Sequence, residues 1–177
     1  MTYTQHYDSP LGGILLAADD VGLTGLWFDG QKYFARGLSN ERIAQETSVL
    51  AEAKRWLDIY FTGKEPDFTP PLHPIGSAFR RSVWEILLQI PYGQTTTYGE
   101  IARQLSKKQG LERMSAQAVG GAVGHNEISI IIPCHRVVGA DGNLTGYAGG
   151  IGKKEKLLEL ERADMSRFFV PKKGTAL

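Results

Sequence analysis

The sequence predicts an α+β fold, with a small N-terminal domain of antiparallel β-sheet and helix and a mostly helical C-terminal domain that contains a helix-turn-helix. Three observations predict this class. Short apolar runs alternate with turn residues early in the chain, four of the eight prolines gather between residues 62 and 76, and helical spacing dominates afterwards. A length of 177 residues suits one domain or two small ones.

The first 75 residues have the pattern of a sheet followed by a helix. The turn sequences Ser-Pro-Leu-Gly and Asp-Asp-Val-Gly separate three short runs of apolar and β-branched residues, which predicts an antiparallel meander. These runs are residues 3–8, 13–18 and 23–28. Asn40 then precedes residues 41–61, whose apolar side chains recur at helical spacing, so we expect one helix there.

A proline-rich stretch divides the chain. Because proline fixes φ and restricts the residue before it, we expect an extended linker over residues 62–76. We therefore place an N-terminal α+β domain at residues 1–75 and a C-terminal helix-turn-helix domain at residues 76–177. The first carries a net charge of −4 and the second +5, within a formal total of +1. A basic half favours a polyanionic partner, although ordinary solvated surface charge also explains such an asymmetry.

The C-terminal half has mostly helical periodicity. Residues 79–88 have the pattern of one amphipathic helix, which ends before Pro91 and the Tyr-Gly turn that follows. Thr97 and Glu100 form a capping box at the start of a short helix, and a glycine-containing connection leads to another helix over residues 115–124. Two short helices joined in this way resemble a helix-turn-helix.

The helix predicted at residues 115–124 contains three glycines, and each costs roughly 1 kcal/mol relative to alanine. Two explanations compete for them. The glycines permit tight packing against the core, or they leave a smooth surface that enters a DNA groove. The composition favours both explanations equally.

The chemistry-bearing segment is IIIPCHRVV, residues 130–138. An apolar, strand-like run ends at Pro133, and the only cysteine of the chain follows, with His135 beside it. A nearby base stabilises a thiolate as a nucleophile, and a carboxylate can orient the imidazole. Neighbours in an extended chain point to opposite faces, so contact between Cys134 and His135 requires a local turn. A buried packing cysteine and a hydrogen-bonded core histidine are the alternatives.

A glycine-rich loop, residues 139–150, follows the cysteine. Its glycines permit the backbone to wrap around a flat ligand with N–H groups free to bond it, while a plain surface loop is the alternative. Asn126 lies shortly before the apolar run, where a helix C-cap is the simplest role for it.

Together these residues resemble one known family. Pro133-Cys134-His135-Arg136-Val137, with Asn126 upstream and residues 146–150 downstream, is similar to the O6-alkylguanine-DNA alkyltransferases, also called methylated-DNA–protein-cysteine methyltransferases. The resemblance covers about residues 79–161, and the N-terminal half fits the family's variable, ribonuclease H-like partner domain. It implies direct-reversal DNA repair: after base flipping, the alkyl group of O6-alkylguanine moves irreversibly and stoichiometrically to the protein's own cysteine. O4-alkylthymine is a second candidate substrate.

The resemblance also implies a role for each site residue. Cys134 accepts the alkyl group, His135 is its base through a water, and Glu161 orients the histidine. Asn126 ties the helix-turn-helix to the active-site strand, and the hydroxyl of Tyr147 donates a proton to the departing guanine. The residues expected to contact the DNA or the flipped base are Tyr98, which presses on a phosphate, and Gln117, Ala118, Gly120, Val137, Ala148 and Gly149.

Two positions depart from the family's pattern. Gln117 stands where an arginine commonly fills the hole left by the extruded base, and a glutamine bonds the orphaned base without a charge. Ala148 replaces a frequent serine, and we expect little loss because the contact there is through the backbone N–H. Arg136 is expected to make structural bonds.

The remaining expectations concern partners and setting. The partner is double-stranded DNA carrying O6-alkylguanine, bound through the minor groove by a monomer that needs no cofactor. One cysteine and four scattered histidines predict no structural metal and no internal disulfide. Without a bilayer-length apolar run or a secretory signal pattern, a cytoplasmic protein with no membrane segment is expected.

Three other functions are compatible with parts of the pattern. Alkyltransferase-like sensors of damaged bases replace the cysteine, which is present here. A cysteine hydrolase would use Cys134, His135 and Glu161 as a triad and turn over an ester substrate. A helix-turn-helix regulator would bind a specific DNA sequence independently of Cys134.

Overall fold

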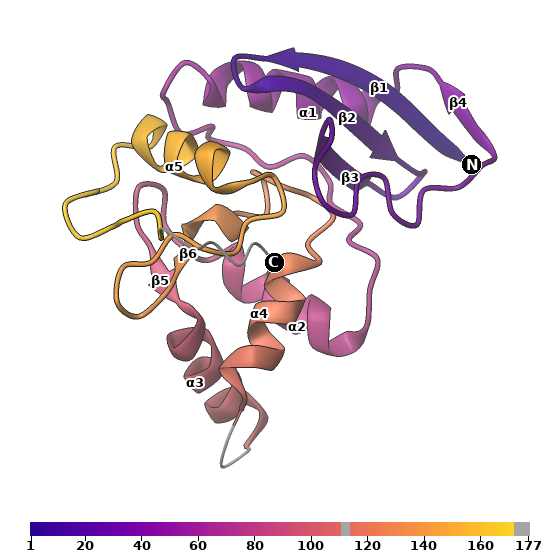
Figure 1. Cartoon of the computed structure of the whole chain (residues 1–177). Coiled ribbons are helices and arrows are strands. Elements are labelled where there is room, and N and C mark those ends of the chain that lie inside the picture. Colours follow the sequence, from indigo (N-terminus) through magenta and orange to yellow (C-terminus); the bar gives the residue numbers. More distant parts are fainter. Residues whose placement is uncertain (111–113, 172–177) are drawn as a thin grey trace. The chain divides into compact units, whose positions relative to one another are not determined.

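The computed structural model describes residues 1–110 and 114–171 and divides into two compact units (Figure 1). Unit 1 consists of Met1–Ile75 and Glu127–Ile131, and unit 2 of Gly76–Asn126 and Ile132–Leu177. The arrangement confirms the α+β class, since unit 1 holds a sheet with one helix and unit 2 is mostly helical. Within the described ranges, no helix is long and apolar enough to cross a membrane.

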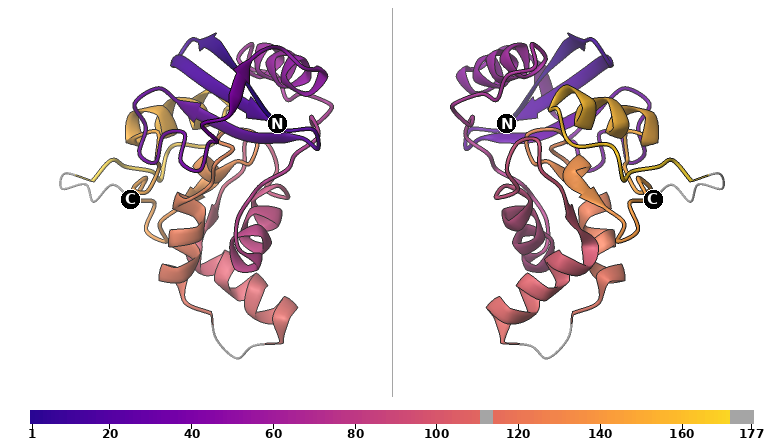
Figure 2. Two further views of the ribbon diagram at one scale, coloured as in Figure 1. Left: turned by 90° about the vertical axis from the view of Figure 1, so that its right-hand side faces the viewer. Right: turned by 90° about the vertical axis from the view of Figure 1, so that its left-hand side faces the viewer.

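Unit 1 is a four-stranded sheet with a helix against it. Strands β1 (Thr2–Ser9), β2 (Gly12–Ala18) and β3 (Leu23–Phe28) pair antiparallel in sequence, which confirms the predicted meander. A short strand β4 (Arg42–Ala44) pairs parallel with β1, so the sheet order is β3-β2-β1-β4. Helix α1 (Ser48–Tyr60) packs along this sheet (Figures 1 and 2).

The helix expected over residues 41–61 is shorter than predicted. Its first residues are instead strand β4, because their backbone completes the edge of the sheet beside β1. The helix begins at Ser48, and the Thr47 hydroxyl caps it by accepting a hydrogen bond from the Leu50 backbone N–H at 3.3 Å. Asn40 therefore precedes a strand and caps no helix.

Residues 127–131 belong to unit 1 although they follow the helix-turn-helix in sequence. The Leu26 N–H donates to the Glu127 carbonyl at 2.8 Å, and the Ser129 N–H donates to the Leu26 carbonyl at 3.1 Å. The strand-like run predicted before Pro133 is therefore wrong: one bridge to β3 is followed by a turn. Ile130 occupies the left-handed region at φ 69°, which is strained for a β-branched residue.

The described residues of unit 2 form four helices and a two-stranded parallel sheet. They are α2 (Ala78–Leu87), β5 (Thr96–Thr97), α3 (Tyr98–Gln109), α4 (Ala116–Gly124), β6 (Val137–Val138) and α5 (Ile151–Leu160), with the 3-10 turn η1 (Cys134–Arg136) before β6. Helices α2, α3 and α4 pack on one another, and the Trp84 indole N–H donates to the Ala122 carbonyl at 2.9 Å. Residues 111–113, between α3 and α4, lie outside the described residues.

Of the two hydrogen bonds in the predicted capping box at the start of α3, the one to the Thr97 hydroxyl is confirmed. The Thr97 hydroxyl accepts from the Glu100 N–H at 3.1 Å, whereas the Glu100 carboxylate pairs with Arg103 one turn later. Gly110 ends the helix in the left-handed conformation at φ 67°, which glycine adopts without a steric cost.

We expect Thr47→Ala to lower the free energy of unfolding by about 1 kcal/mol, because the first turn of α1 loses its cap. Urea unfolding followed by circular dichroism measures this change. Asn40→Ala is the matched control and should lie within about 0.5 kcal/mol of the wild type. Equal losses for the two variants would contradict the observed start of α1.

Candidate functional site

The chain turns sharply at the cysteine. Pro133, at φ −82° and ψ 66°, forms an inverse γ-turn in which the Cys134 N–H donates to the Ile132 carbonyl at 2.8 Å. The single 3-10 turn η1 follows immediately. This supplies the local turn that an extended chain lacks, so Cys134 and His135 do not point to opposite faces. Both side chains are buried, with 5% of Cys134 exposed.

Asn126 holds the sulfur atom directly. Its side-chain amide donates to the Ile132 carbonyl at 2.8 Å and to Cys134 Sγ at 3.3 Å. The residue lies two positions after the end of α4, past the C-cap His125. Asn126 is therefore not the helix cap considered from sequence but a link between the end of α4 and the thiol.

A buried carboxylate organises the residues beside the cysteine. Glu161 Oε2 accepts a hydrogen bond from His135 Nε2 at 2.6 Å, and its two oxygens accept from Arg136 Nε at 2.8 Å and Nη2 at 3.1 Å. Arg136 Nη1 also donates to the Ile90 carbonyl at 2.7 Å. Glu161 is the C-cap of α5, immediately after the last helical turn. Arg136 makes the structural bonds that were expected of it.

The turn before β5 completes the set of Glu161 partners. The Gly93 N–H donates to Glu161 Oε1 at 3.2 Å, and a Cβ at this position would lie 2.9 Å from the Glu161 carbonyl oxygen. Gly93 has φ 76°, so glycine is required here for both its conformation and its close approach. The Arg136 guanidinium also lies 5.7 Å from the centre of the Tyr92 ring.

These contacts fix the protonation states of the pair. Although burial opposes ionisation, the bonds from His135 and Arg136 hold the pKa of Glu161 well below its usual range. Burial lowers the pKa of His135, and Glu161 only partly offsets this effect. Since a carboxylate accepts, the neutral imidazole carries its proton on Nε2. Nδ1 has no hydrogen-bond partner among the described residues, which leaves its lone pair available as a base.

The thiol is stored in its neutral form. Burial raises the pKa of Cys134, while the Asn126 hydrogen bond and the charge of Lys154 act in the opposite direction. Deprotonation therefore requires a base at the moment of reaction. His135 is the adjacent residue that can provide one.

Lys154 was missed in the sequence analysis. This α5 side chain is completely buried, and its ammonium donates to the Val137 carbonyl at 2.5 Å and to the Thr145 carbonyl at 3.3 Å. Burial lowers its pKa to about 8. One sequence signal existed: Lys154 stands at helical spacing with Ile151, Leu157 and Leu158, on the apolar side of its helix.

Two tyrosines from different elements lie near the Cys134–His135 pair. The Tyr98 hydroxyl, at the start of α3, donates to the Thr145 and Gly146 carbonyls at 3.3 and 3.5 Å. Burial and the charge of Cys134 raise the pKa of Tyr98. The Tyr147 ring is buried and lies edge-on to His135, with ring centres 6.4 Å apart. Both therefore belong to the surroundings of Cys134, as does the loop over residues 139–150 that carries Tyr147.

The other sequence-predicted residues divide into an exposed and a buried group. Gln117 and Ala118 are exposed on α4, whereas Gly120 is buried beside Tyr98. Val137 is fully buried next to the cysteine turn, and residues 148–149 are half-buried in the glycine-rich loop.

Packing does not demand the glycines in the middle of α4. A Cβ added at Gly120 would meet the Tyr98 ring at an ordinary 3.8 Å, and one added at Gly121 would meet nothing within 4 Å. Tight packing against the core therefore fails as the reason for these two glycines.

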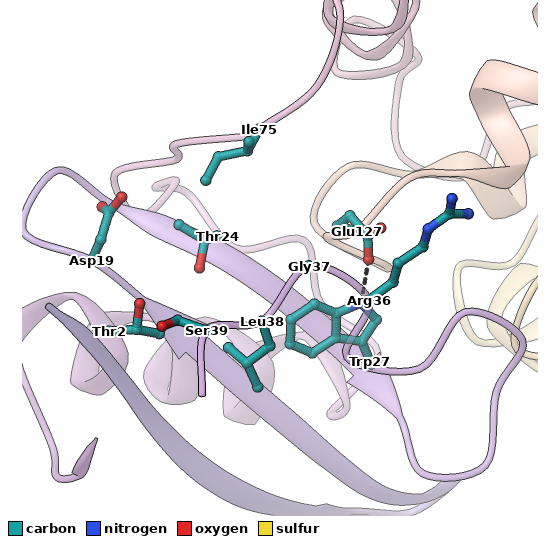
Figure 3. A pocket seen from close by; sticks show the side chains of 10 residues that line it. All are labelled: Thr2, Asp19, Thr24, Trp27, Arg36, Gly37, Leu38, Ser39, Ile75 and Glu127. Carbon is teal, nitrogen blue, oxygen red and sulfur yellow. Dashed lines mark hydrogen bonds between the residues drawn. The ribbon is translucent and has the colours of Figure 1, made fainter. Parts of the chain in front are cut away.

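Unit 1 has a pocket of its own, with a volume of about 400 Å³ (Figure 3). The Trp27 ring forms part of its wall, and the indole N–H donates to Glu127 Oε2 at 2.6 Å. Its lining contains no cysteine or histidine; the ten residues are Thr2, Asp19, Thr24, Trp27, Arg36, Gly37, Leu38, Ser39, Ile75 and Glu127. Nor do three or more His, Cys, Asp or Glu side chains in the described part of the chain converge to hold a metal ion. Cys134 and His135 both lie in unit 2.

Comparisons with known proteins match both halves of the chain. Residues 2–74 match the ribonuclease-like domain of 6-O-methylguanine DNA methyltransferase, and residues 78–163 match its DNA binding domain. Methylated-DNA–protein-cysteine methyltransferases from Methanosarcina acetivorans and Methanosarcina barkeri are 42% and 44% identical, covering 90% and 92% of this chain and 97% and 99% of theirs. Among solved structures, the crystal structure of Mycobacterium tuberculosis OGT in complex with DNA superposes on this chain with a TM-score of 0.77. The two sequences are 42% identical, and the match covers 94% of each chain.

The fold and these matches define a DNA repair methyltransferase that contains a DNA-binding domain. The chain belongs to the methylated-DNA–protein-cysteine methyltransferase family, and it acts on O6-methylguanine in DNA. The family that the motifs around Cys134 indicated is thereby confirmed.

We expect Glu161→Gln to lower the free energy of unfolding at pH 7.5 by about 3 kcal/mol, because Arg136 loses a buried counter-charge. Because the pKa of Glu161 is lower in the folded than in the unfolded chain, its ionised form stabilises the fold above the ordinary carboxyl pKa, and this stabilisation is lost as pH falls. The difference in unfolding free energy between the variant and the wild type should therefore narrow below about pH 4.3. Urea unfolding from about pH 8 to about pH 3 measures both effects. Glu159→Gln, an exposed change on the same helix, is the control, and an equal loss there would contradict the assignment.

Lys154→Met should raise the pKa of Cys134, because a positive charge that favours the thiolate is removed. One pKa unit corresponds to about a tenfold smaller thiolate fraction near pH 7, and alkylation of Cys134 by iodoacetamide as a function of pH reports it. The effect should hold below about pH 8, where Lys154 is charged. Lys156→Met changes an exposed lysine on the same helix and should leave the profile unchanged. Identical profiles for all three proteins would exclude this role for Lys154.

Proposed function

We propose that Cys134 is the residue that accepts the alkyl group from O6-alkylguanine in double-stranded DNA, irreversibly and once per protein molecule. One observation carries this proposal. The sulfur of Cys134 accepts a hydrogen bond from Asn126, just after the helix-turn-helix, and the next residue in the chain is a buried histidine whose Nε2 is bonded to a carboxylate. A DNA-binding element and a base that is oriented for proton transfer therefore meet at one nucleophile.

The exposed face of α4 is the proposed DNA contact. Gln117 and Gly121 lie one turn apart on this helix and Ala118 follows Gln117 directly; two of these three residues have small side chains or none. Such a surface enters the narrow minor groove, and the packing of α4 offers no other reason for Gly121. Gln117 is the longest side chain there, and it bonds the base left behind by flipping.

The target must leave the duplex before the thiol can reach it. Base flipping costs a few kcal/mol, and less for a damaged base whose pairing is weakened. Tyr98 stands at the N-terminus of α3, where the backbone N–H groups and the helix dipole favour an anion such as a phosphate. It therefore presses on the phosphate beside the flipped nucleotide.

The flipped base needs contacts that hold its O6 position towards the sulfur. Val137, directly after the cysteine turn, and Ala148 and Gly149, in the half-buried part of the glycine-rich loop, provide these contacts through their backbones and line the alkyl pocket. The Ala148 side chain is therefore of little consequence for recognition.

The chemical step exchanges a carbon–oxygen bond for a carbon–sulfur bond. His135 Nδ1 takes the thiol proton through a bridging water, and the thiolate attacks the alkyl carbon in line with the bond to O6. The electron pair of that bond leaves with guanine, and Tyr147 supplies a proton to it. The proton on His135 then restores Tyr147, so the net change moves an alkyl group from oxygen to sulfur and a proton from sulfur to guanine. No cofactor takes part.

The product explains why the protein acts once. A thiolate is a poor leaving group from a thioether, so a neighbouring side chain does not readily remove the alkyl group from Cys134. The reaction needs a reduced thiol, so we place the protein in a reducing, cytoplasmic compartment. We further propose that it acts as a monomer, with residues 1–75 as the ribonuclease H-like domain, residues 62–76 as linker and residues 76–177 as the alkyltransferase domain.

Intact-mass analysis tests the proposal. After incubation with duplex DNA containing O6-methylguanine, the wild type should gain the mass of one methyl group on Cys134, and the moles of DNA demethylated should equal the moles of protein consumed. Cys134→Ala should bind the same duplex and transfer nothing. His135→Ala should react at least about a hundredfold more slowly and still reach the same end point.

Other outcomes would point to the competing functions. Many turnovers on an ester without a retained adduct would indicate a cysteine hydrolase. Binding of damaged DNA without any mass gain by the wild type would indicate a sensor. Sequence-specific binding that is indifferent to both the lesion and Cys134 would indicate a regulator.

A further inference from the structure

The segment that follows α5 returns to the glycine-rich loop of the site. Helix α5 ends with Arg162 in the left-handed conformation at φ 59°, and the Ala163 N–H bonds back to the Leu158 carbonyl at 3.0 Å, which reverses the chain. We call residues 165–169 the C-terminal strap. All five are described, and none is required for the bonds between His135, Glu161 and Arg136.

The backbone of Phe169 in the strap forms two hydrogen bonds with the glycine-rich loop, one on each side of Asn143. The Phe169 N–H donates to the Gly142 carbonyl at 3.0 Å, and the Leu144 N–H donates to the Phe169 carbonyl at 3.1 Å. The two segments thereby form a parallel bridge between Asn143 and Phe169. The Phe169 side chain itself is 45% exposed, so its backbone carries the contact.

An apolar cluster anchors the strap against the same loop. Phe168 and Met165 pack against a small core in which Leu144 of the loop is a member. The other members are Val138, Leu158 and Ala163, with Ile151 at the edge. Gly142 allows the close approach, because a Cβ there would lie 2.0 Å from the Arg167 carbonyl oxygen.

Hydrogen bonds connect Asn143, the residue bridged by the strap, to residues near Cys134. Asn143 Oδ1 accepts from the Thr145 N–H at 2.8 Å and also from the Thr145 hydroxyl. The Thr145 carbonyl in turn accepts from the Tyr98 hydroxyl and from the Lys154 ammonium. Tyr147 follows two residues later. Each step from Phe169 to Thr145 is a hydrogen bond or a chain neighbour.

We infer that the C-terminal strap is a positioning element for alkyl transfer: its bridge to Asn143 fixes the Thr145 carbonyl and thereby the places of Tyr98, Lys154 and Tyr147 around the cysteine. The inference rests on the proposed role of Cys134 as the acceptor. Reacting groups lose rate steeply when they are displaced by an ångström, so a loosened loop should slow the chemical step more than DNA binding.

Two substitutions at one position test this inference. Phe169→Pro removes the N–H that bonds Gly142, whereas Phe169→Ala keeps it and shortens only a half-exposed side chain. The rate constant of methyl transfer is measured at a saturating concentration of methylated duplex. The affinity for the same duplex is measured after each substitution is combined with Cys134→Ala, so that no transfer occurs during binding. We expect Phe169→Pro to lower the rate constant by about tenfold or more with affinity changed less than about threefold, and Phe169→Ala to stay within about twofold of wild type.

Phe168→Ala is the second test, because it removes the apolar anchor and leaves both backbone bonds possible. It should slow transfer in the same direction, and Phe168→Leu should restore most of the rate. Phe79→Ala, a half-buried aromatic on α2 away from the loop, controls for general loss of stability. Hydrogen exchange at the Leu144 amide should quicken in both Phe169→Pro and Phe168→Ala, exchange at the Phe169 amide should quicken in Phe168→Ala, and neither should change in Phe79→Ala.

The outcomes separate this inference from the function on which it rests. A wild type that transfers no methyl group would overturn the role of Cys134 itself. A wild type that transfers normally, with Phe169→Pro equally fast or slowed only in proportion to Phe79→Ala, would overturn the positioning role of the strap. Slower transfer with an unchanged end point of one methyl group per protein is the supporting result.

Discussion

The site depends on one buried carboxylate whose hydrogen-bonding capacity is filled. Glu161 is 2% exposed, and it accepts hydrogen bonds from His135 Nε2, from Nε and Nη2 of the Arg136 guanidinium and from the Gly93 backbone N–H. A carboxylate without such partners would be neutralised or would destabilise the fold by several kcal/mol. Meeting this requirement joins three separate stretches of chain: the turn after α2, the turn at the cysteine and the end of α5. The position of the imidazole follows from that junction.

The same burial keeps Cys134 unreactive at rest. A low-pKa, exposed thiolate oxidises readily, and its higher oxidation states are not reversed. Here burial raises the pKa of Cys134 and lowers that of His135, so the resting pair is neutral. Asn126 and Lys154 oppose the rise without overcoming it. The resting thiol is thus protected, and its conversion to the thiolate requires a base.

Recognition and chemistry are connected over a short distance in unit 2. The chain passes from α4 through its cap at His125 to Asn126, whose amide reaches the sulfur. On the opposite side, Tyr98 starts α3 and bonds the loop that carries Tyr147. Each helix of the helix-turn-helix therefore contacts one wall of the cysteine site. A shift of either helix would be transmitted to the surroundings of Cys134, because tightly packed protein interiors transmit strain.

The sequence by itself determined the local features: the meander, the cap at Thr97, the turn at Gly110, and the motif around Cys134 with its family. These features depend on interactions between residues that are close in the chain, so residue type and spacing are enough to predict them. Tertiary structure decided the rest. Residues 41–47 became a strand edge and a cap because β1 offered an unpaired edge, and the run before Pro133 bent because residues 127–129 pair with β3. Lys154 entered the site because its helix turns it inward onto two carbonyls supplied by distant segments, and only the folded chain brings those carbonyls together.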